Sequence, residues 1–250
     1  GPINGRIARW IMGYIGNRVK MITVRDRGSL KELASLGITR PPIEPTADPV
    51  HAIHQVDTTQ GREILLKHGA LVGKKPLVCI SVREWCNMNY YKEIVAQAAD
   101  RIVEDFQAQV VFLPMQYPED VKTAQLVADM AQHEMLVLPE EYNTSQLLSI
   151  VGNMDLLISI RLHALIFAGV MGVPMIGISY DPKVDRFLES VGEESVGTLE
   201  NVELEKLMAQ VHLKWKDREG FSQQNEQLFD DLRHLAMCNA ELAYSVIGKD

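Results

Sequence analysis

Apolar and polar positions along the 250-residue chain fall into blocks that predict strands and helices in turn. Short runs rich in branched apolar residues, which suit buried parallel strands, lie at 77–82, 110–114, 135–138, 156–160 and 173–179. Segments with helical spacing of apolar residues lie at 92–107, 120–133, 145–151, 164–170 and from Pro182 onward. This alternation predicts an α/β fold with a doubly wound parallel sheet over Leu77–Thr198.

Further elements are predicted on both sides of this sheet. Residues 6–19 predict a helix that carries Ile7, Trp10, Ile11, Tyr14 and Ile15 on one face. A strand at 21–24, a helix at 29–36 capped by Ser29 and a strand at 43–47 follow as a β-α-β unit. After the sheet, two helices are predicted at 202–215 and 221–247.

We divide the chain into three parts on this pattern. Residues 1–57 are interpreted as the remnant of an amino-terminal α/β domain, because only one β-α-β unit precedes the larger sheet. The polar stretch 58–75 is expected to be a linker. Residues 76–250 are expected to form a Rossmann-like domain whose last helix is long enough to reach back to a partner domain.

Charged side chains follow two neighbouring strands of the predicted sheet. Arg161, Leu162 and His163 come directly after one buried strand, and Lys183 follows the next, while Arg83 ends the first strand of the sheet. In open parallel sheets, ligands bind at the carboxyl ends of the strands. Arginine offers a planar fork for a carboxylate or phosphate, and imidazole exchanges a proton near neutral pH. These residues predict an anion site with acid–base chemistry.

The sequence also allows purely structural roles for the same residues. His163 could be a buried histidine that hydrogen-bonds a strand end, and Arg161 could form a salt bridge with Asp155 or Asp181. Lys183 could be an ordinary surface lysine. The aromatic residues Trp85, Tyr90 and Tyr91, which follow the first strand, could stack on a sugar ring or cover the sheet edge.

Composition narrows the class of ligand and the compartment. The net charge of −8 argues against general nucleic-acid binding, so an anionic ligand needs a local positive pocket. The three cysteines show neither disulfide nor metal spacing, and no metal site or glycine-rich nucleotide loop is predicted, so no cofactor is expected. No signal peptide or membrane-spanning run is predicted, and we expect a cytoplasmic protein.

Several motifs in the chain resemble those of the polysaccharide pyruvyl transferases. The matching residues are Arg161-Leu162-His163-Ala164-Leu165, Gly172-Val173-Pro174 and Tyr180-Asp181-Pro182-Lys183, with Val24-Arg25-Asp26, Ser29 and Ala47-Asp48-Pro49 before them. The resemblance implies a glycosyltransferase-B-like architecture and transfer of pyruvate from phosphoenolpyruvate to a sugar of a cell-wall or exopolysaccharide precursor as a ketal. It also implies a lipid-linked or polymeric saccharide acceptor, met by peripheral contact where the acceptor is membrane-tethered.

The strand-end residues are the candidates for this reaction. His163 and Lys183 are the catalytic candidates, and Arg161, Leu162 and Arg83 are the candidates for donor binding, with Arg25 an alternative further ligand. Two other functions remain open: a nucleotide-sugar glycosyltransferase of the same architecture and a non-catalytic anion-binding module. Because most of a first domain is expected to be missing, the 250-residue chain is expected to bind phosphoenolpyruvate but transfer it poorly.

Overall fold

The computed structural model describes Ile3 and residues 5–247 of the chain. It divides into two compact units. One consists of Gly1–His54 with Gln227–Asp250, and the other is the continuous segment Gln55–Glu226. The candidate strand-end residues Arg83, Arg161, Leu162, His163 and Lys183 all belong to the continuous unit.

Five parallel strands form the sheet of the continuous unit, in the order β5-β4-β3-β6-β7. They are β3 (Leu77–Ser81), β4 (Gln109–Phe112), β5 (Leu136–Val137), β6 (Leu156–Ser159) and β7 (Met175–Gly177). All residues of β3, β6 and β7 are buried, as expected of strands covered on both faces. The strand order reverses between β3 and β6, where Ser81 pairs with Ser159. The predicted strands are confirmed, although β7 is shorter than the 173–179 segment.

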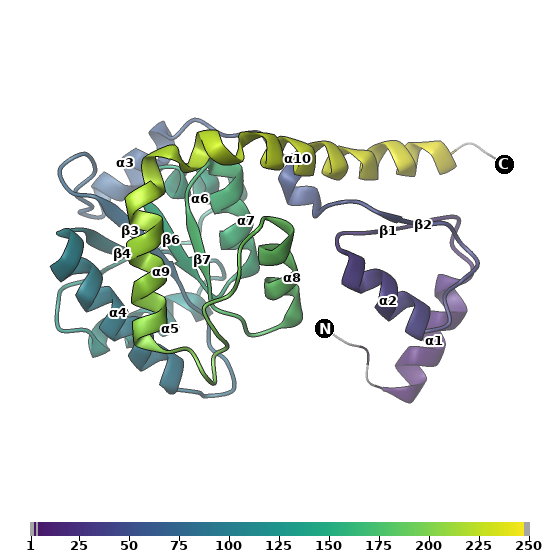
Figure 1. Ribbon diagram of the computed structural model, residues 1–250, viewed down its shortest axis with the longest axis horizontal. Helices are drawn as coiled ribbons and strands as arrows, with labels where there is room; N and C mark the ends of the chain where they lie inside the picture. The colour runs from purple at the N-terminus through teal and green to yellow at the C-terminus, as the bar shows by residue number, and fades with distance from the viewer. Residues whose placement is uncertain (1–2, 4, 248–250) are drawn as a thin grey trace. The chain divides into compact units, whose positions relative to one another are not determined.

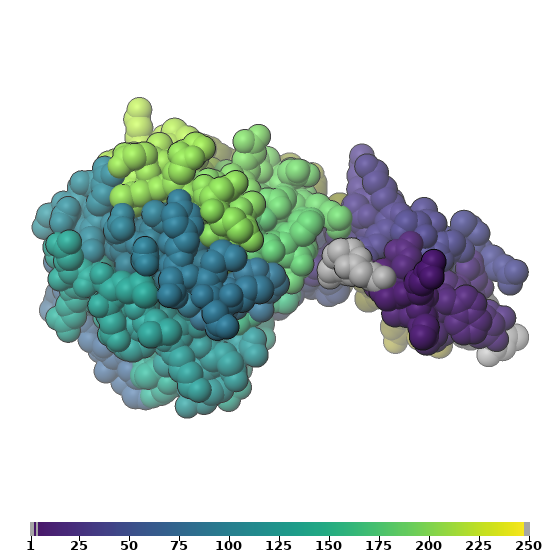
Figure 2. Space-filling view, turned by 90° about the horizontal axis from the view of Figure 1, so that it is seen from below, coloured from purple at the N-terminus to yellow at the C-terminus, as the bar shows by residue number. Residues whose placement is uncertain are grey.

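Helices cover both faces of this sheet (Figure 1). One layer contains α4, α5 and α9, and the other contains α3, α6 and α7, with α8 following β7. In the space-filling view, the atoms of this unit form one continuous mass from blue to yellow-green (Figure 2). The bounds of these helices are α3 (Thr59–Lys67), α4 (Tyr90–Phe106), α5 (Glu119–Met130), α6 (Thr144–Val151), α7 (Leu162–Met171), α8 (Pro182–Ser190) and α9 (Leu204–Asp217).

The segment 58–75 differs from the expected linker because it contains α3 and belongs to the continuous unit. Leu65 of α3 is fully buried, and Gly61 lies against the backbone of Ser149 in α6, so closely that a Cβ at Gly61 would come 2.2 Å from the Ser149 carbonyl oxygen. The Gly61 N–H donates to Ser149 Oγ at 2.7 Å. The polar composition of the segment reflects the exposed face of a packed helix.

The discontinuous unit contains a two-stranded parallel sheet of β1 (Ile22–Val24) and β2 (Ile43–Pro45). Its other elements are α1 (Arg6–Gly16), α2 (Arg27–Ser35), η1 (Pro49–Ala52) and most of α10 (Phe221–Val246), which follows η2 (Arg218–Gly220). Asn239 of α10 donates to the Ala47 carbonyl at 3.1 Å and contacts Thr46 Oγ1. The carboxyl-terminal helix therefore contributes to the amino-terminal unit.

Two local expectations for this unit need revision. Asp26, not Ser29, caps α2: its carboxylate accepts hydrogen bonds from the Ser29 N–H and hydroxyl at 2.8 and 2.9 Å. A carboxylate satisfies free N–H groups at a helix start and also favours its positive end. The apolar face predicted on α1 is present, but it is exposed, with Ile7 76% and Trp10 69% accessible.

His51 of η1 is a buried histidine in this unit, only 4% exposed. Burial lowers its pKa to about 4, although the nearby Asp48 charge acts in the opposite direction. In the unfolded chain, His51 binds a proton below pH ~6.5. The free energy of unfolding therefore decreases as the pH falls from there toward about 4. The total loss is about 3 kcal/mol.

We expect His51→Phe to remove most of this acid sensitivity, because phenylalanine cannot be protonated. His54→Phe changes a neighbouring exposed histidine and serves as the control. Urea unfolding followed by circular dichroism between pH 7.5 and 4.5 measures the effect. Equal pH dependence in wild type and His51→Phe would contradict the role of His51.

Within the described residues, none of the helices combines the length and apolarity needed to cross a bilayer.

Candidate functional site

The carboxyl ends of β3, β6 and β7 bring the predicted residues to one edge of the sheet. Arg83 follows β3, Arg161 follows β6 as the N-cap of α7, and Lys183 lies in the first turn of α8 after β7. Leu162 is the first residue of α7 and is buried. The first N–H groups of a helix have no acceptor within the helix and attract anions, so this start of α7 adds to the positive character of the edge.

His163 lies in the first turn of α7 and is exposed. The alternative of a buried histidine that serves only a strand end is therefore wrong. His163 follows Arg161 by two residues, at the start of the helix that comes after the switch-point strand β6.

Arg161 is held by a contact that the sequence did not predict. Its Nη2 donates to Asp120 Oδ1 and, at 3.2 Å, to Gln116 Oε1. The suggested partners Asp155 and Asp181 are wrong. Asp155 lies at the opposite, amino-terminal end of β6 and accepts from the Leu77 N–H at 2.8 Å, and Asp181 caps α8.

A cluster of cations and aromatic rings lies beside Arg161. The Arg83 guanidinium lies 4.6 Å from the Tyr180 ring centroid and 5.1 Å from that of Trp85. Lys183 Nζ lies 4.9 Å from the same Tyr180 ring, and Trp85 meets Tyr180 edge-on at 4.9 Å. Cations are attracted to the faces of aromatic rings, so Tyr180 holds two positive charges at the ends of β3 and β7.

Two guanidinium nitrogens at this edge lack a partner. Among the described residues, Arg83 Nε and Arg161 Nε are buried and make no hydrogen bond. Nearly all buried donors in proteins are hydrogen-bonded, so an exception needs an explanation. Arg83 and Arg161 follow adjacent strands on the two sides of the β3/β6 switch point. These two arginines make the edge a candidate site for an anionic ligand.

The other aromatic candidates support the loop after β3. Tyr91 is fully buried and donates its hydroxyl to the Arg83 carbonyl at 2.5 Å, and burial raises the pKa of its phenol. Tyr90 donates to the Val202 carbonyl at 2.9 Å. The buried Lys92 donates to Glu84 Oε2 at 2.6 Å. These bonds fix the loop that carries Arg83, and they favour a covering role for Tyr90 and Tyr91 over sugar stacking.

Arg25, the alternative further ligand, lies in the discontinuous unit. Its Nη1 donates to Asp48 Oδ2 at 2.8 Å, and its Nε lies 3.9 Å from Asp26. Its charge is therefore already paired with two carboxylates. By contrast, the buried Nε of Arg83 makes no hydrogen bond within the described part of the chain, so Arg83 is the better candidate.

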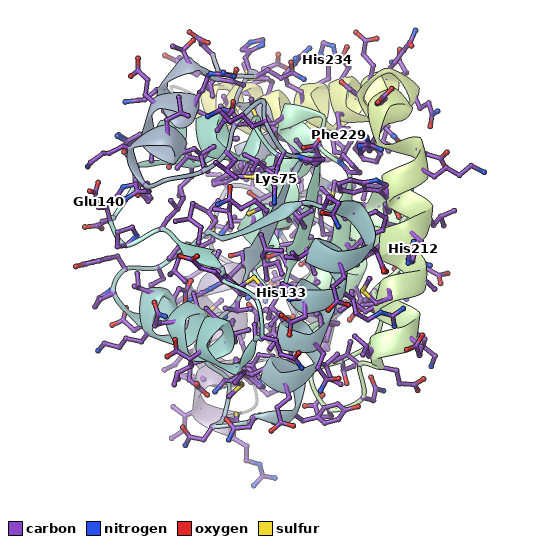
Figure 3. The ribbon with its side chains drawn as sticks, turned by 90° about the vertical axis from the view of Figure 1, so that its left-hand side faces the viewer. Lys75, His133, Glu140, His212, Phe229 and His234 are labelled. Atoms are coloured by element: carbon purple, nitrogen blue, oxygen red, sulfur yellow. The ribbon has the colours of Figure 1, made fainter. Side chains whose placement is uncertain are left out.

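The histidines of the continuous unit do not gather into a metal site. His133 and His212 lie apart (Figure 3), each beside its own carboxylate: Asp100 at 3.0 Å and Asp105 at 3.2 Å. Over the described part of the chain, no group of three or more histidine, cysteine or acidic residues is arranged to hold a metal ion.

Two residues of the site were missed or given no role from the sequence. Asp120, which binds Arg161, is an acidic residue in the first turn of the helix after β4, so its place at the same sheet edge was a readable signal. Tyr180 belongs to the motif Tyr180-Asp181-Pro182-Lys183, but its role depends on the contact of two cations, Arg83 and Lys183, with its ring.

A family model described as polysaccharide pyruvyl transferase matches residues 1–182. No curated protein sequence matches the chain. Solved structures give similar folds at low identity. The UDP-GlcNAc 2-epimerase of Neisseria meningitidis, bound to UDP-GlcNAc, has a TM-score of 0.67 at 11% identity, with 98% of this chain and 66% of that chain covered.

Two further structures show the same fold. The S. aureus MnaA–UDP structure has a TM-score of 0.60 at 13% identity, covering 88% of this chain and 56% of its own. A glycosyltransferase from Rickettsia africae has a TM-score of 0.60 at 12% identity, and the match covers 96% of this chain and 68% of that chain. The fold is thus glycosyltransferase-B-like, and the chain spans between half and two thirds of the length of the first two structures.

Proposed function

Because the chain belongs to the polysaccharide pyruvyl transferase family, we propose that it carries the donor site for pyruvyl transfer from phosphoenolpyruvate. The acceptor is a sugar of a cell-wall or exopolysaccharide precursor, either lipid-linked or polymeric, and the products are a pyruvate ketal and phosphate. We place the reaction in the cytoplasm, with peripheral contact where the acceptor is membrane-tethered.

One observation carries the proposal: the two buried guanidinium Nε donors of Arg83 and Arg161, which lack partners among the described residues. They lie at adjacent strand ends, with Lys183 after the next strand. In phosphoenolpyruvate the enol carbon bears the carboxylate directly and the phosphate through the enol oxygen. Both anionic groups can accept paired hydrogen bonds from an arginine guanidinium. The helix start at Leu162 adds N–H groups for the same anion.

In the proposed mechanism, protonated His163 donates a proton to the methylene carbon of phosphoenolpyruvate. The next carbon then becomes an oxocarbenium-like centre, and a sugar hydroxyl attacks it and returns a proton to His163. Phosphate leaves, and a second sugar hydroxyl closes the ketal ring as its proton passes to the phosphate. Lys183, with Arg83 and Arg161, stabilises the charge on the leaving phosphate.

The main alternative is a nucleotide-sugar-dependent glycosyltransferase, and a second is a non-catalytic anion-binding module. The structural neighbours solved with UDP or UDP-GlcNAc favour testing the first. In the described residues, however, the edge presents cationic donors rather than a glycine-rich phosphate loop.

Calorimetric titration of the chain with phosphoenolpyruvate, UDP and UDP-GlcNAc, beside a phosphate-release assay with an aminosugar acceptor, separates these functions. We expect binding of phosphoenolpyruvate and none of UDP. Binding of UDP alone would favour the glycosyltransferase. Binding of phosphoenolpyruvate without phosphate release, also in a longer protein that contains this chain and with a full range of acceptors, would favour the non-catalytic module.

A further inference from the structure

Asp120 is a buried carboxylate in the first turn of α5, with a side chain only 1% exposed. Its Oδ2 accepts hydrogen bonds from the N–H groups of Met115 and Gln116, at 3.1 and 3.0 Å. These amides belong to the loop between β4 and α5. A buried charge requires such compensation, and two backbone donors leave the carboxylate little freedom to rotate.

The other oxygen of Asp120 faces Arg161. Oδ1 accepts from Arg161 Nη2, and Gln116 Oε1 accepts from the same nitrogen at 3.2 Å. One end of the guanidinium is therefore occupied, whereas Nε is buried without a hydrogen-bond partner among the described residues. Because the guanidinium is planar and rigid, holding Nη2 restricts the positions that the rest of the group can take.

The strand order places this contact relative to Arg83. Asp120 follows β4 and Arg161 follows β6, and β3 lies between these two strands. The Asp120–Arg161 contact therefore crosses the carboxyl end of β3. Arg83 stands directly beyond that end, and its Nε also makes no hydrogen bond to any residue that the structure describes. A fixed Arg161 keeps the two guanidinium groups on the same stretch of the sheet edge.

We propose that Asp120 is the positioning residue of this anion site: it anchors Arg161 to the β4–α5 loop so that the guanidinium is held at the strand edge for the donor. The anchoring of Arg161 is a property of the chain itself, and its effect on phosphoenolpyruvate rests on the proposed function. Arginine side chains lose much rotamer freedom when they are ordered, and Asp120 removes that freedom before the ligand binds.

Charge and positioning predict opposite effects of Asp120→Asn. The negative charge of Asp120 repels a bound anion, so its removal alone would tighten phosphoenolpyruvate binding. If Asp120 positions Arg161, its removal weakens binding instead. An asparagine has one acceptor oxygen, so it cannot accept from both the loop amides and Arg161 as the carboxylate does.

The test is a double-mutant cycle on phosphoenolpyruvate affinity, measured by calorimetry on the whole chain. We expect Asp120→Asn to weaken binding about tenfold, the range of one lost charge-assisted hydrogen bond, and to have no further effect in an Arg161→Ala background. Asp129→Asn on the exposed side of α5 is the matched control and should leave affinity unchanged. Tighter binding by Asp120→Asn, or an equal loss in both backgrounds, would overturn the proposal.

A second readout needs no ligand. Nitrogen-15 relaxation of the Arg161 Nε–Hε pair should report a rigid side chain in the wild type and a mobile one in Asp120→Asn, with exposed Arg62 as the mobile reference. A rigid Arg161 in the variant would overturn the proposal even if phosphoenolpyruvate proves not to be the ligand. If circular dichroism shows that Asp120→Asn does not fold, Asp120→Ser, which keeps one oxygen for the loop amides, replaces it in both measurements.

Discussion

In a form of the protein that carries out pyruvyl transfer, replacement of His163 with alanine is expected to abolish that transfer while leaving the fold and phosphoenolpyruvate binding in place. His163 is exposed in the first turn of α7, so its removal leaves no cavity in the core. Acid–base catalysis by a positioned group contributes roughly 10²–10⁴-fold to a rate. The variant should therefore lose at least that factor in phosphate release.

Phosphate release with an aminosugar acceptor measures this loss, and calorimetry with phosphoenolpyruvate verifies the intact donor site. His133→Ala and His212→Ala, which change two other histidines of the same unit (Figure 3), are the controls and should retain activity. A His163→Ala rate above about a tenth of wild type lies outside the expected range for acid–base catalysis and would move this role to another residue.

Loss of both arginines at the β3 and β6 ends is expected to reduce phosphoenolpyruvate affinity about a hundredfold. Each charge-assisted hydrogen bond contributes about 1.5–3 kcal/mol, so Arg83→Ala and Arg161→Ala should each weaken binding roughly tenfold or more. Arg161→Lys should also weaken binding, because lysine keeps the charge but cannot reproduce the planar fork. Lys183→Ala should follow the same direction.

Titration calorimetry on the single and double variants measures these losses, with Arg62→Ala on the exposed face of α3 as the control. Circular dichroism verifies folding, since Arg161 also bonds the buried Asp120. Titration curves that match wild type in both single variants would place the donor elsewhere in the protein.

The sheet could be predicted from the sequence because its strands are buried on both faces. Such strands read as unbroken apolar runs, and the run 156–160 is the plainest example. Helix starts with strong local signals were also predictable: Asn143 forms a capping box with Gln146, and Pro182 begins α8. These signals are local, so one sequence is enough to read them.

The sequence predicts a linker where helix α3 lies, because the buried face of this helix is narrow. Only Gly61 and Leu65 of its nine residues are buried, and they occur one helical turn apart among polar residues. The reason for Gly61, its close approach to the Ser149 backbone, exists only in the folded packing of α3 on α6. Composition alone could not distinguish this helix from a polar connection.

The candidate site was predictable as a set of strand-end residues but not as a set of contacts. Arg161 and Asp120 are 41 residues apart, and their contact depends on β4 and β6 lying on either side of β3. No short sequence motif predicts that strand order. The same applies to Tyr180, whose two cations come from the loop after β3 and from α8.

Trp85 gives the protein an intrinsic optical reporter of its own site. Indole emission responds to a nearby positive charge, and the Arg83 guanidinium lies 5.1 Å from the Trp85 ring, which also touches Tyr180. An anion that draws Arg83 away from the ring changes the field at Trp85. The two other tryptophans stand in different surroundings: Trp10 is largely exposed, and Trp215 packs on Phe106. Occupancy of the strand edge can therefore be followed by fluorescence, without a label and in real time.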